Sequence, residues 1–182
     1  MNKNIEVLLI SEFDMEWAIC KQYSILFSGT VVGHTKTYTF TKEKIDNFIE
    51  EDYAFYMYED TKIKENICNL LYENMGSAEI VYIDELFFKN EYRGKGMGSI
   101  VLKEIEHLNT NCAFVLLASA LEYIHEFIVN EDYRTEVINK LCTFYTNNGY
   151  NHHGSVFYKG IDFSEENWMD FDNYDDGCDS DD

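Results

Sequence analysis

The order of hydrophobic and polar positions along the chain predicts a protein of mixed helix and strand content. Alternating or continuous apolar stretches predict strands, and apolar positions three and four residues apart predict helices. The predicted strands cover 4–10, 23–33, 35–40, 78–89, 112–119 and 155–161. The predicted helices cover 12–22, 62–74, 98–108, 121–130 and 133–145, and a further helix is expected to start at Thr41.

Two of these stretches say more about the sheet. Residues 112–119 (CAFVLLAS) are almost continuously apolar, which is typical of a strand covered on both faces, so we expect it to be central. Residues 23–33 and 35–40 are rich in β-branched and aromatic side chains around Gly33, which predicts the two antiparallel strands of a hairpin.

The length of 182 residues suits one domain with a substantial core. Apolar residues at 46% and aromatic residues at 16% are too frequent for a disordered chain. The patterns fade near the C-terminus, so we expect a domain over 1–163 and an acidic, disordered tail over 164–182. Aromatic residues in that tail, such as Trp168, leave open that it docks on a basic partner or over the protein's own cleft.

The net charge of −20 is spread over both parts, since ten acidic residues and no Lys or Arg follow Lys159. A field of this sign repels nucleic-acid backbones and attracts cations. We therefore expect no direct nucleic-acid binding, and a cationic small molecule or a basic protein as substrate or partner. High solubility is the simpler explanation of the charge. The sequence is also compatible with a homodimer.

The five cysteines are scattered, odd in number and without a C-x-x-C pair, which argues against a disulfide framework or a zinc site. His34, His107 and His125 add no metal-ligand spacing, so we expect no metal. The N-terminus lacks a signal-peptide pattern, and no stretch reaches the ~20 apolar residues that span a bilayer. We expect a soluble, cytoplasmic protein with no membrane contact.

A glycine-rich loop lies between the strand predicted at 78–89 and the helix predicted at 98–108. Gly94, Gly96 and Gly98 let the backbone turn tightly and bring its N–H groups against an anion, while the following helix adds its positive dipole end. No G-K-[ST] follows, and the spacing is not G-x-G-x-x-G, which excludes a Walker loop and a dinucleotide-binding turn. The pattern predicts a pyrophosphate-binding loop.

The residues around these glycines resemble a known family. Arg93 to Gly98 (RGKGMG) is similar to the R-x-x-G-x-G signature of the GNAT superfamily of N-acetyltransferases, and residues 83–88 (IDELFF) look like its cofactor-binding strand. The resemblance covers 78–159, while 1–77 diverge. It implies an α/β (α+β) GNAT fold, with a central mixed, mostly antiparallel twisted sheet flanked by helices, and acetyl-coenzyme A as co-substrate.

The resemblance also implies which residues bind the cofactor. The backbone N–H groups of 94–99 would hold the pyrophosphate of coenzyme A, and the strand edge at 86–88 would pair with the pantetheine arm. The implied cofactor-binding residues are Leu86, Phe87, Phe88, Arg93, Gly94, Lys95, Gly96, Met97, Gly98 and Ser99. For the family's asparagine contact to coenzyme A, Asn139 is the candidate.

A second segment, 141–150 (LCTFYTNNGY), resembles the F-Y-x-x-x-G-[FY] segment of the family. The family has a tyrosine at Tyr145 that protonates the departing thiolate of coenzyme A, which is the general-acid role in acyl transfer. The alternative for Tyr145 is a packing role between a helix and the sheet. Phe144 and Tyr150 are expected in the core. His152 and His153 are expected to be turn residues, and the alternative for them is a role as a base or a contact to the nucleotide.

Asp84 and Glu85 are the candidates for the base that takes a proton from the attacking amine. Successive strand residues face opposite ways, so only one of them can face the cleft unless a β-bulge intervenes. Asp84 is the first choice, because the segment looks most like spermidine/spermine N-acetyltransferases, whose acid falls there. Glu85 would bind the cationic substrate or face solvent, and Glu79 is a third candidate; all of them could instead be ordinary strand-end acids.

The sequence thus predicts an acyltransferase that moves an acetyl group directly from acetyl-coenzyme A to a primary amine. Its acceptor would be a polyamine-like small molecule or a protein lysine. The alternative is a catalytically degenerate GNAT fold that binds a basic partner through its acidic surface.

Overall fold

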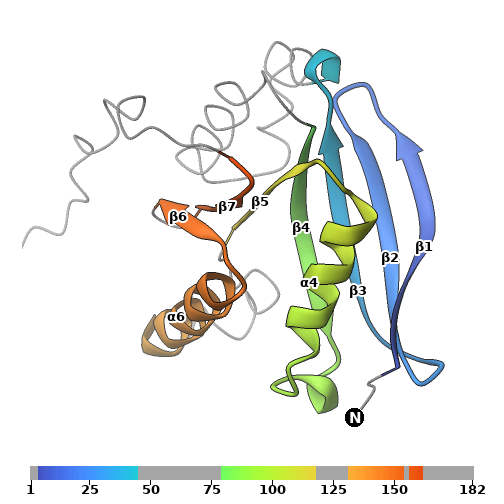
Figure 1. Cartoon of the computed structure of the whole chain (residues 1–182). Coiled ribbons are helices and arrows are strands. Elements are labelled where there is room, and N and C mark those ends of the chain that lie inside the picture. The colour runs from blue at the N-terminus through green and yellow to red at the C-terminus, as the bar shows by residue number, and fades with distance from the viewer. Residues whose placement is uncertain (1–3, 45–78, 118–130, 154–155, 162–182) are drawn as a thin grey trace, which may run out of the picture.

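The computed structural model describes residues 4–44, 79–117, 131–153 and 156–161, which form an α+β fold around one mixed sheet (Figure 1). The described part of this sheet has seven strands in the order β1-β2-β3-β4-β5-β7-β6. The strands are β1 (Ile5–Asp14), β2 (Ile19–Phe27), β3 (Thr30–Phe40), β4 (Ile80–Phe88), β5 (Ala113–Leu117), β6 (Asn151–His153) and β7 (Val156–Lys159). The helical elements are η1 (Asn90–Tyr92), α4 (Met97–Leu108) and α6 (Glu131–Asn147).

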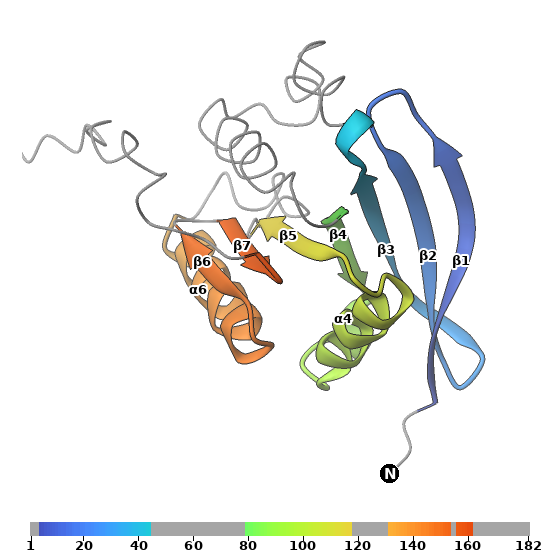
Figure 2. The ribbon, with the colours of Figure 1, turned by 45° about the horizontal axis from the view of Figure 1, so that its top comes forward.

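β4 and β5 form the parallel pair of the described sheet, and the other neighbouring strands are antiparallel. A parallel pair requires a crossover connection, which α4 supplies here. α4 and α6 lie on the same side of the sheet (Figure 2). The expected mixed, mostly antiparallel sheet is therefore present in the described residues.

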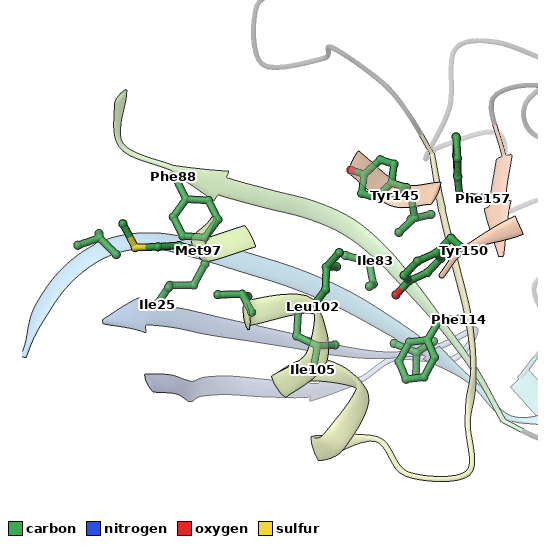
Figure 3. Close-up of a cluster of buried hydrophobic side chains, with 14 residues drawn as sticks. Ile25, Ile83, Phe88, Met97, Leu102, Ile105, Phe114, Tyr145, Tyr150 and Phe157 are labelled. Carbon is green, nitrogen blue, oxygen red and sulfur yellow. The ribbon is translucent and has the colours of Figure 1, made fainter. Parts of the chain in front are cut away.

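The side chains of the sheet pack on both of its faces. On the side of α4 and α6, called the helix face below, Ile83, Leu102, Tyr145 and Phe157 belong to one buried cluster that joins the sheet to both helices (Figure 3). On the opposite side, called the far face, a second cluster is built around Tyr38, Phe40 and Tyr82, among others.

β5 contributes to both clusters, as a central strand should. Phe114 and Leu116 join the helix-face cluster, and Ala113 and Val115 join the far-face cluster. This alternation confirms the prediction of a strand covered on both faces.

The helix predicted over 12–22 is wrong. Residues 12–14 belong to β1 and residues 19–22 to β2, so the chain reverses between them. Trp17 in this connection packs against Tyr38 and Phe40, with ring centroids 5.0 and 6.2 Å away. The loose spacing of the apolar residues in 12–22 therefore reflects one large, partly buried ring in a hairpin connection, and not a helical stripe.

The hairpin of β2 and β3 is present, but it turns at Ser28 and Gly29, whose φ angles are 51° and 79°. Gly33 lies within β3, where an added side chain would collide with the carbonyl of Phe87 on β4. A glycine inside a strand marks such a close approach of two backbones, which the sequence cannot distinguish from a turn.

The other predicted elements of the described part are confirmed, with small changes of boundary. Residues 42–44 begin a helix, and the Thr41 hydroxyl accepts the N–H of Lys44 at 3.4 Å. The helices predicted at 62–74 and 121–130 and the tail at 164–182 lie outside the described residues. Across the ranges that are described, no helix is long and apolar enough to cross a membrane.

Candidate active site

The glycine loop connects β4 to α4 by way of η1. β4 ends at Phe88, and α4 begins at Met97 with Gly96 as its N-cap residue. Gly94 and Gly96 have φ angles of +67° and +71°, which other residues adopt rarely. No capping side chain occupies the N–H groups in the first turn of α4, which also lack partners within the helix. Left-handed glycines and an uncapped helix start are features that anion-binding turns also have.

Gly98 differs from the other two glycines, because packing against a neighbouring side chain explains why glycine occupies this position. A Cβ at this position would lie 2.9 Å from Cζ of Phe144 on α6, closer than real contacts allow. Met97 beside it is buried in the helix-face cluster, so it can offer a ligand only its backbone. Ser99 is half-buried. Of the predicted loop residues, Gly94, Lys95 and Gly96 are the exposed ones.

The cationic side chains of the loop contact β4 and η1. Arg93 donates a hydrogen bond from Nε to the carbonyl of Phe88 at 2.7 Å, and its guanidinium lies 5.2 Å from the ring centre of Phe87. The Nζ of Lys95 lies 5.5 Å from the ring centre of Tyr92. Two positive charges are thus held beside the glycines.

β4 contains a β-bulge at Asp84. Ile83 pairs with Thr37 of β3 while Glu85 pairs with Lys36, which leaves Asp84 as an extra residue. Asp84 and Glu85 consequently contact two β3 side chains on the far face, Lys36 and His34. The bulge therefore removes the alternation that would have separated the two acids.

The bulge coincides with the end of the parallel pairing. β5 pairs with β4 only up to the pair of Ile83 and Leu116, while β4 continues to Phe88. Beyond that pair the two strands diverge (Figure 1). On the β5 side, residues 85–88 have no strand partner in the described part of the chain. Such an edge offers N–H and C=O groups to an extended ligand.

Asp84 is held by an ion pair with Lys36, with Oδ2 and Nζ 3.0 Å apart. Burial lowers the pKa of Lys36, but the hydrogen bond with Tyr38 and the attraction of Asp84 outweigh burial and raise it overall. For the neighbouring Tyr38, burial is the largest cause and raises the pKa of the hydroxyl. Lys36 therefore remains charged at neutral pH and paired with Asp84.

Glu85 makes a separate contact with His34, whose Nε2 lies 3.0 Å from Oε1. The imidazole stacks on Phe87, with ring centroids 4.9 Å apart. The side chains of Glu85 and His34 are 39% and 48% exposed, against 26% and 28% for Asp84 and Lys36. Glu85 is thus the more accessible of the two carboxylates.

Tyr145 lies on α6 with its ring buried on the helix face. The ring packs against Phe157 at a centroid distance of 5.2 Å, and its hydroxyl points away from Phe157 (Figure 3). Burial, with a smaller contribution from Cys142, raises the pKa of Tyr145 to about 12. The hydroxyl is therefore protonated at neutral pH, as a proton donor must be.

The strand register puts Tyr145 and Asp84 at the same level of the sheet on opposite faces. Phe157, against which Tyr145 packs, pairs with Leu116. Leu116 in turn pairs with Ile83, the residue before Asp84. Both residues therefore lie at the level of the sheet where the β4–β5 pairing ends.

The C-terminal end of α6 is tied to α4 and β7. Lys159 binds both carboxylate oxygens of Glu106 at 2.8 and 2.9 Å, and the hydroxyl of Tyr150 donates to the same carboxylate at 3.1 Å. Burial, reinforced by Glu106, raises the pKa of Tyr150. These contacts explain why Tyr150 is a core residue and help to position the segment that includes Tyr145.

The remaining candidates are less closely connected to the loop and the bulge. Glu79 is exposed just before β4, and Asn139 is exposed on α6. His152 was predicted in a turn, which is wrong: it belongs to β6 and stacks on Phe157 at 5.1 Å. His153 ends the same strand. No cluster of His, Cys, Asp or Glu within the described ranges could hold a metal ion.

Sequence reasoning missed His34, Thr35, Lys36 and Tyr38 of β3 as neighbours of the candidate acids. The sequence could have predicted that His34, Lys36 and Tyr38 share a face, since a strand puts every second residue on one face. The pairing of β3 with β4 was not visible, because it joins residues about 50 positions apart.

Comparison of the chain with known protein families gives no match, and comparison with characterised proteins gives no significant match. The candidate site therefore rests on its residues and their geometry.

Proposed function

We propose that this protein is an acetyl-coenzyme A-dependent N-acyltransferase with a GNAT fold, which acetylates a primary amine of a cationic acceptor. One observation carries the proposal. The β4–β5 pairing ends beside the bulge residue Asp84, and the unpaired edge of β4 runs from there directly into the glycine loop. An extended ligand with a pyrophosphate at one end and a reactive group at the other matches this arrangement.

The loop supports binding of the pyrophosphate. Gly94 and Gly96 have the backbone conformations that bring consecutive N–H groups together, and the start of α4 adds its dipole. Arg93 and Lys95 supply positive charge beside them, in a protein whose net charge is −20. Local cations in an acidic protein favour a specific anion site over general attraction of polyanions.

The unpaired edge supports binding of the pantetheine arm. Its amide groups can pair with the backbone at Leu86 and Phe87, as an added strand would. The carbonyl of Phe88 already accepts a hydrogen bond from Arg93, so this end of the edge is partly satisfied within the protein. The thioester would then lie near Asp84, where β5 separates from β4.

The proton transfers follow from the positions of the side chains. An amine on the far face gives a proton to Asp84 or Glu85, directly or through water. Its nitrogen bonds to the acetyl carbon, the carbon–sulfur bond breaks, and the departing sulfur takes a proton from Tyr145, which regains one from solvent. With a pKa of about 12, Tyr145 keeps its proton until the sulfur departs, and its hydrogen bond stabilises the developing thiolate.

The far face favours a cationic acceptor. Glu85 lies there with a carboxylate that is 39% exposed, near the ring of Phe87, and carboxylates and aromatic faces both attract ammonium groups. Asp84 and the ring of Tyr38 already contact Lys36, so Glu85 would be the first contact of an incoming cation. A polyamine-like molecule and a lysine on a basic protein both satisfy this chemistry. Holding the amine beside the thioester would account for much of the rate.

Calorimetric titration of the purified protein with acetyl-coenzyme A tests the proposal. We expect saturable, micromolar binding that Gly96→Glu abolishes, because the new side chain adds bulk, strain and negative charge at the pyrophosphate. Gly29→Glu is the matched control, since Gly29 also has a positive φ but lies in the β2–β3 turn. It should bind normally.

A thiol-release assay over polyamines, aminoglycosides and lysine peptides then identifies the acceptor. If the folded protein does not bind acetyl-coenzyme A, the enzyme proposal is wrong. The acidic binding protein with a degenerate fold would then become the better explanation of the net charge.

A further inference from the structure

β1 forms one edge of the sheet, and its outer side has no strand partner in the described part of the chain. Both views show it as the outermost strand (Figures 1 and 2). Along its ten residues, alternate N–H and C=O groups point to this outer side. By contrast, the opposite edge is β6, which has only three residues. Short edges are protected from pairing with other chains, and long edges are not.

Large apolar side chains are exposed along the same strand. Leu8, Leu9, Ile10 and Phe13 are 48%, 52%, 63% and 55% exposed. They are four of the seven large hydrophobic side chains that are exposed in the described residues. Scattered apolar side chains are normal on a protein surface, but a group of them on one strand marks an interaction surface.

We propose that β1 pairs in antiparallel fashion with β1 of a second copy of this chain, so that the two sheets join across a two-fold axis. Identical strands that pair in this way present the same surface to each other, and the assembly therefore closes at two copies. The pairing satisfies the free backbone groups and covers the exposed apolar side chains. It does not depend on the proposed enzymatic function.

The alternation of side chains along β1 selects one register for this pairing. Leu9 pairs with Tyr23 and Ser11 with Gln22, so the odd-numbered residues before Ile10 and the even-numbered residues after it point to one face. With the axis between Leu9 and Ile10, the paired residues of 5–8 and 11–14 share a face, and no acidic residue faces another. A shift of the axis by half a residue pair either way would oppose residues of different faces. In the selected register the pairs are Ile5 with Asp14, Glu6 with Phe13, Val7 with Glu12, Leu8 with Ser11 and Leu9 with Ile10.

The irregularity in β1 is compatible with the same register. The pairing of β1 with β2 shifts between Leu9 and Ser11, so Ile10 is a bulged residue. An axis beside Ile10 brings the two bulges together at the centre of the contact. The regular segments 5–8 and 11–14 of one copy then pair with 11–14 and 5–8 of the other.

The net charge gives this dimer a characteristic salt dependence. Two copies of net charge −20 repel each other, and added salt screens the repulsion. A contact built from apolar side chains and backbone hydrogen bonds should therefore strengthen as the salt concentration rises. A contact built from ion pairs would weaken.

Light scattering after size-exclusion chromatography, together with sedimentation velocity, tests the proposal on the full chain. At micromolar concentration and moderate salt we expect the wild type to have twice the 21.4 kDa mass of one chain. Ile10→Lys and Leu8→Lys should reduce the mass to that of one chain. Leu108→Lys is the matched control, because Leu108 is also 50% exposed but lies on α4. It should remain a dimer.

Hydrogen exchange adds a second readout, and circular dichroism checks that each variant is folded. The amides of β1 should exchange more slowly as the wild-type concentration rises, and should not respond in Ile10→Lys. A wild-type mass of one chain at every concentration and salt level would overturn the proposal and leave the edge to a different partner. A dimer that survives both β1 variants, or assemblies larger than two, would overturn it too.

Discussion

The hydroxyl of Thr35 donates a hydrogen bond to the carbonyl of Glu85, with the two oxygens 2.6 Å apart, directly beside the bulge at Asp84. A bulge disturbs the regular ladder and leaves backbone groups in need of other partners. Here a buried side chain of the neighbouring strand supplies one. Thr35 thus helps to hold the backbone conformation that brings Asp84 and Glu85 to one face.

Thr35→Val should therefore destabilise the protein by about 1–3 kcal/mol, because it leaves a carbonyl of the bulge without its partner. Urea denaturation measures the change. Thr37→Val is the control on the same strand, since the buried hydroxyl of Thr37 has no hydrogen-bond partner among the described residues. It should be neutral or stabilising by up to about 1 kcal/mol. Equal losses for both variants would refute this role of Thr35.

Replacing the two candidate bases one at a time should separate their roles. If Asp84 is the proton acceptor, Asp84→Asn lowers turnover by about 100-fold or more, while Glu85→Gln acts mainly on the acceptor's KM. The reverse pattern would assign the base to Glu85, which is the more exposed carboxylate. Acetyl-coenzyme A affinity, measured by calorimetry, should stay normal in both. Unchanged kinetics in both variants would exclude a carboxylate base on β4.

If Tyr145 is the proton donor, Tyr145→Phe lowers turnover by about 100-fold and leaves acetyl-coenzyme A affinity close to normal, because only the hydroxyl is lost. Tyr150→Phe serves as a control for the loss of a neighbouring hydroxyl. It removes the hydrogen bond to Glu106 and should cost about 1 kcal/mol of stability, with little effect on turnover. Normal turnover in Tyr145→Phe would leave Tyr145 with a packing role alone.

Tyr145 should also make the folded state sensitive to alkaline pH. Its pKa is about 12 in the folded protein and about 10 in an unfolded chain. Above pH ~10 the unfolded chain releases this proton while the folded protein keeps it, so the free energy of unfolding falls as the pH rises. The contribution is fully present below pH ~10, and about 2–3 kcal/mol is lost by pH ~12.

Denaturation of the wild type and of Tyr145→Phe over this pH range isolates that effect. The phenylalanine variant should lose less stability on alkalinisation than the wild type. Other buried tyrosines such as Tyr38 titrate in both proteins and cancel in the comparison. Identical pH dependence would show that the pKa of Tyr145 is not raised by burial.

Gly98→Ala should destabilise the protein by about 1–3 kcal/mol, because the new methyl group would overlap the ring of Phe144. This sign is the opposite of what helix propensity alone predicts, since alanine is favoured over glycine by up to ~1 kcal/mol inside a helix. Shortening the partner in the double variant Gly98→Ala/Phe144→Leu should recover part of the loss. Thermal denaturation measures both, and a stabilised Gly98→Ala would contradict the packing role.

Much of the fold could be read from single segments of the sequence. The apolar run at 112–119, the amphipathic pattern after Gly96 and the glycine loop between strand and helix depend on residues that are neighbours in the chain. Burial at Val101, Leu102 and Ile105 follows the helical period for the same reason. The errors came where a residue meets a distant partner, as the ring of Trp17 does with Tyr38 and the backbone of Gly33 does with that of Phe87.

The candidate site likewise has parts that local sequence motifs predict and parts that depend on contacts between distant segments. The sequence by itself determined the loop glycines, the tyrosine of α6 and the pair of acids, because short motifs encode them. Only the tertiary structure decided that Asp84 is bulged, that both acids face β3, and that Tyr145 reaches the same level of the sheet through Phe157 and Leu116. These relationships depend on strand order and register, which arise from packing between segments far apart in the chain and therefore leave no local pattern.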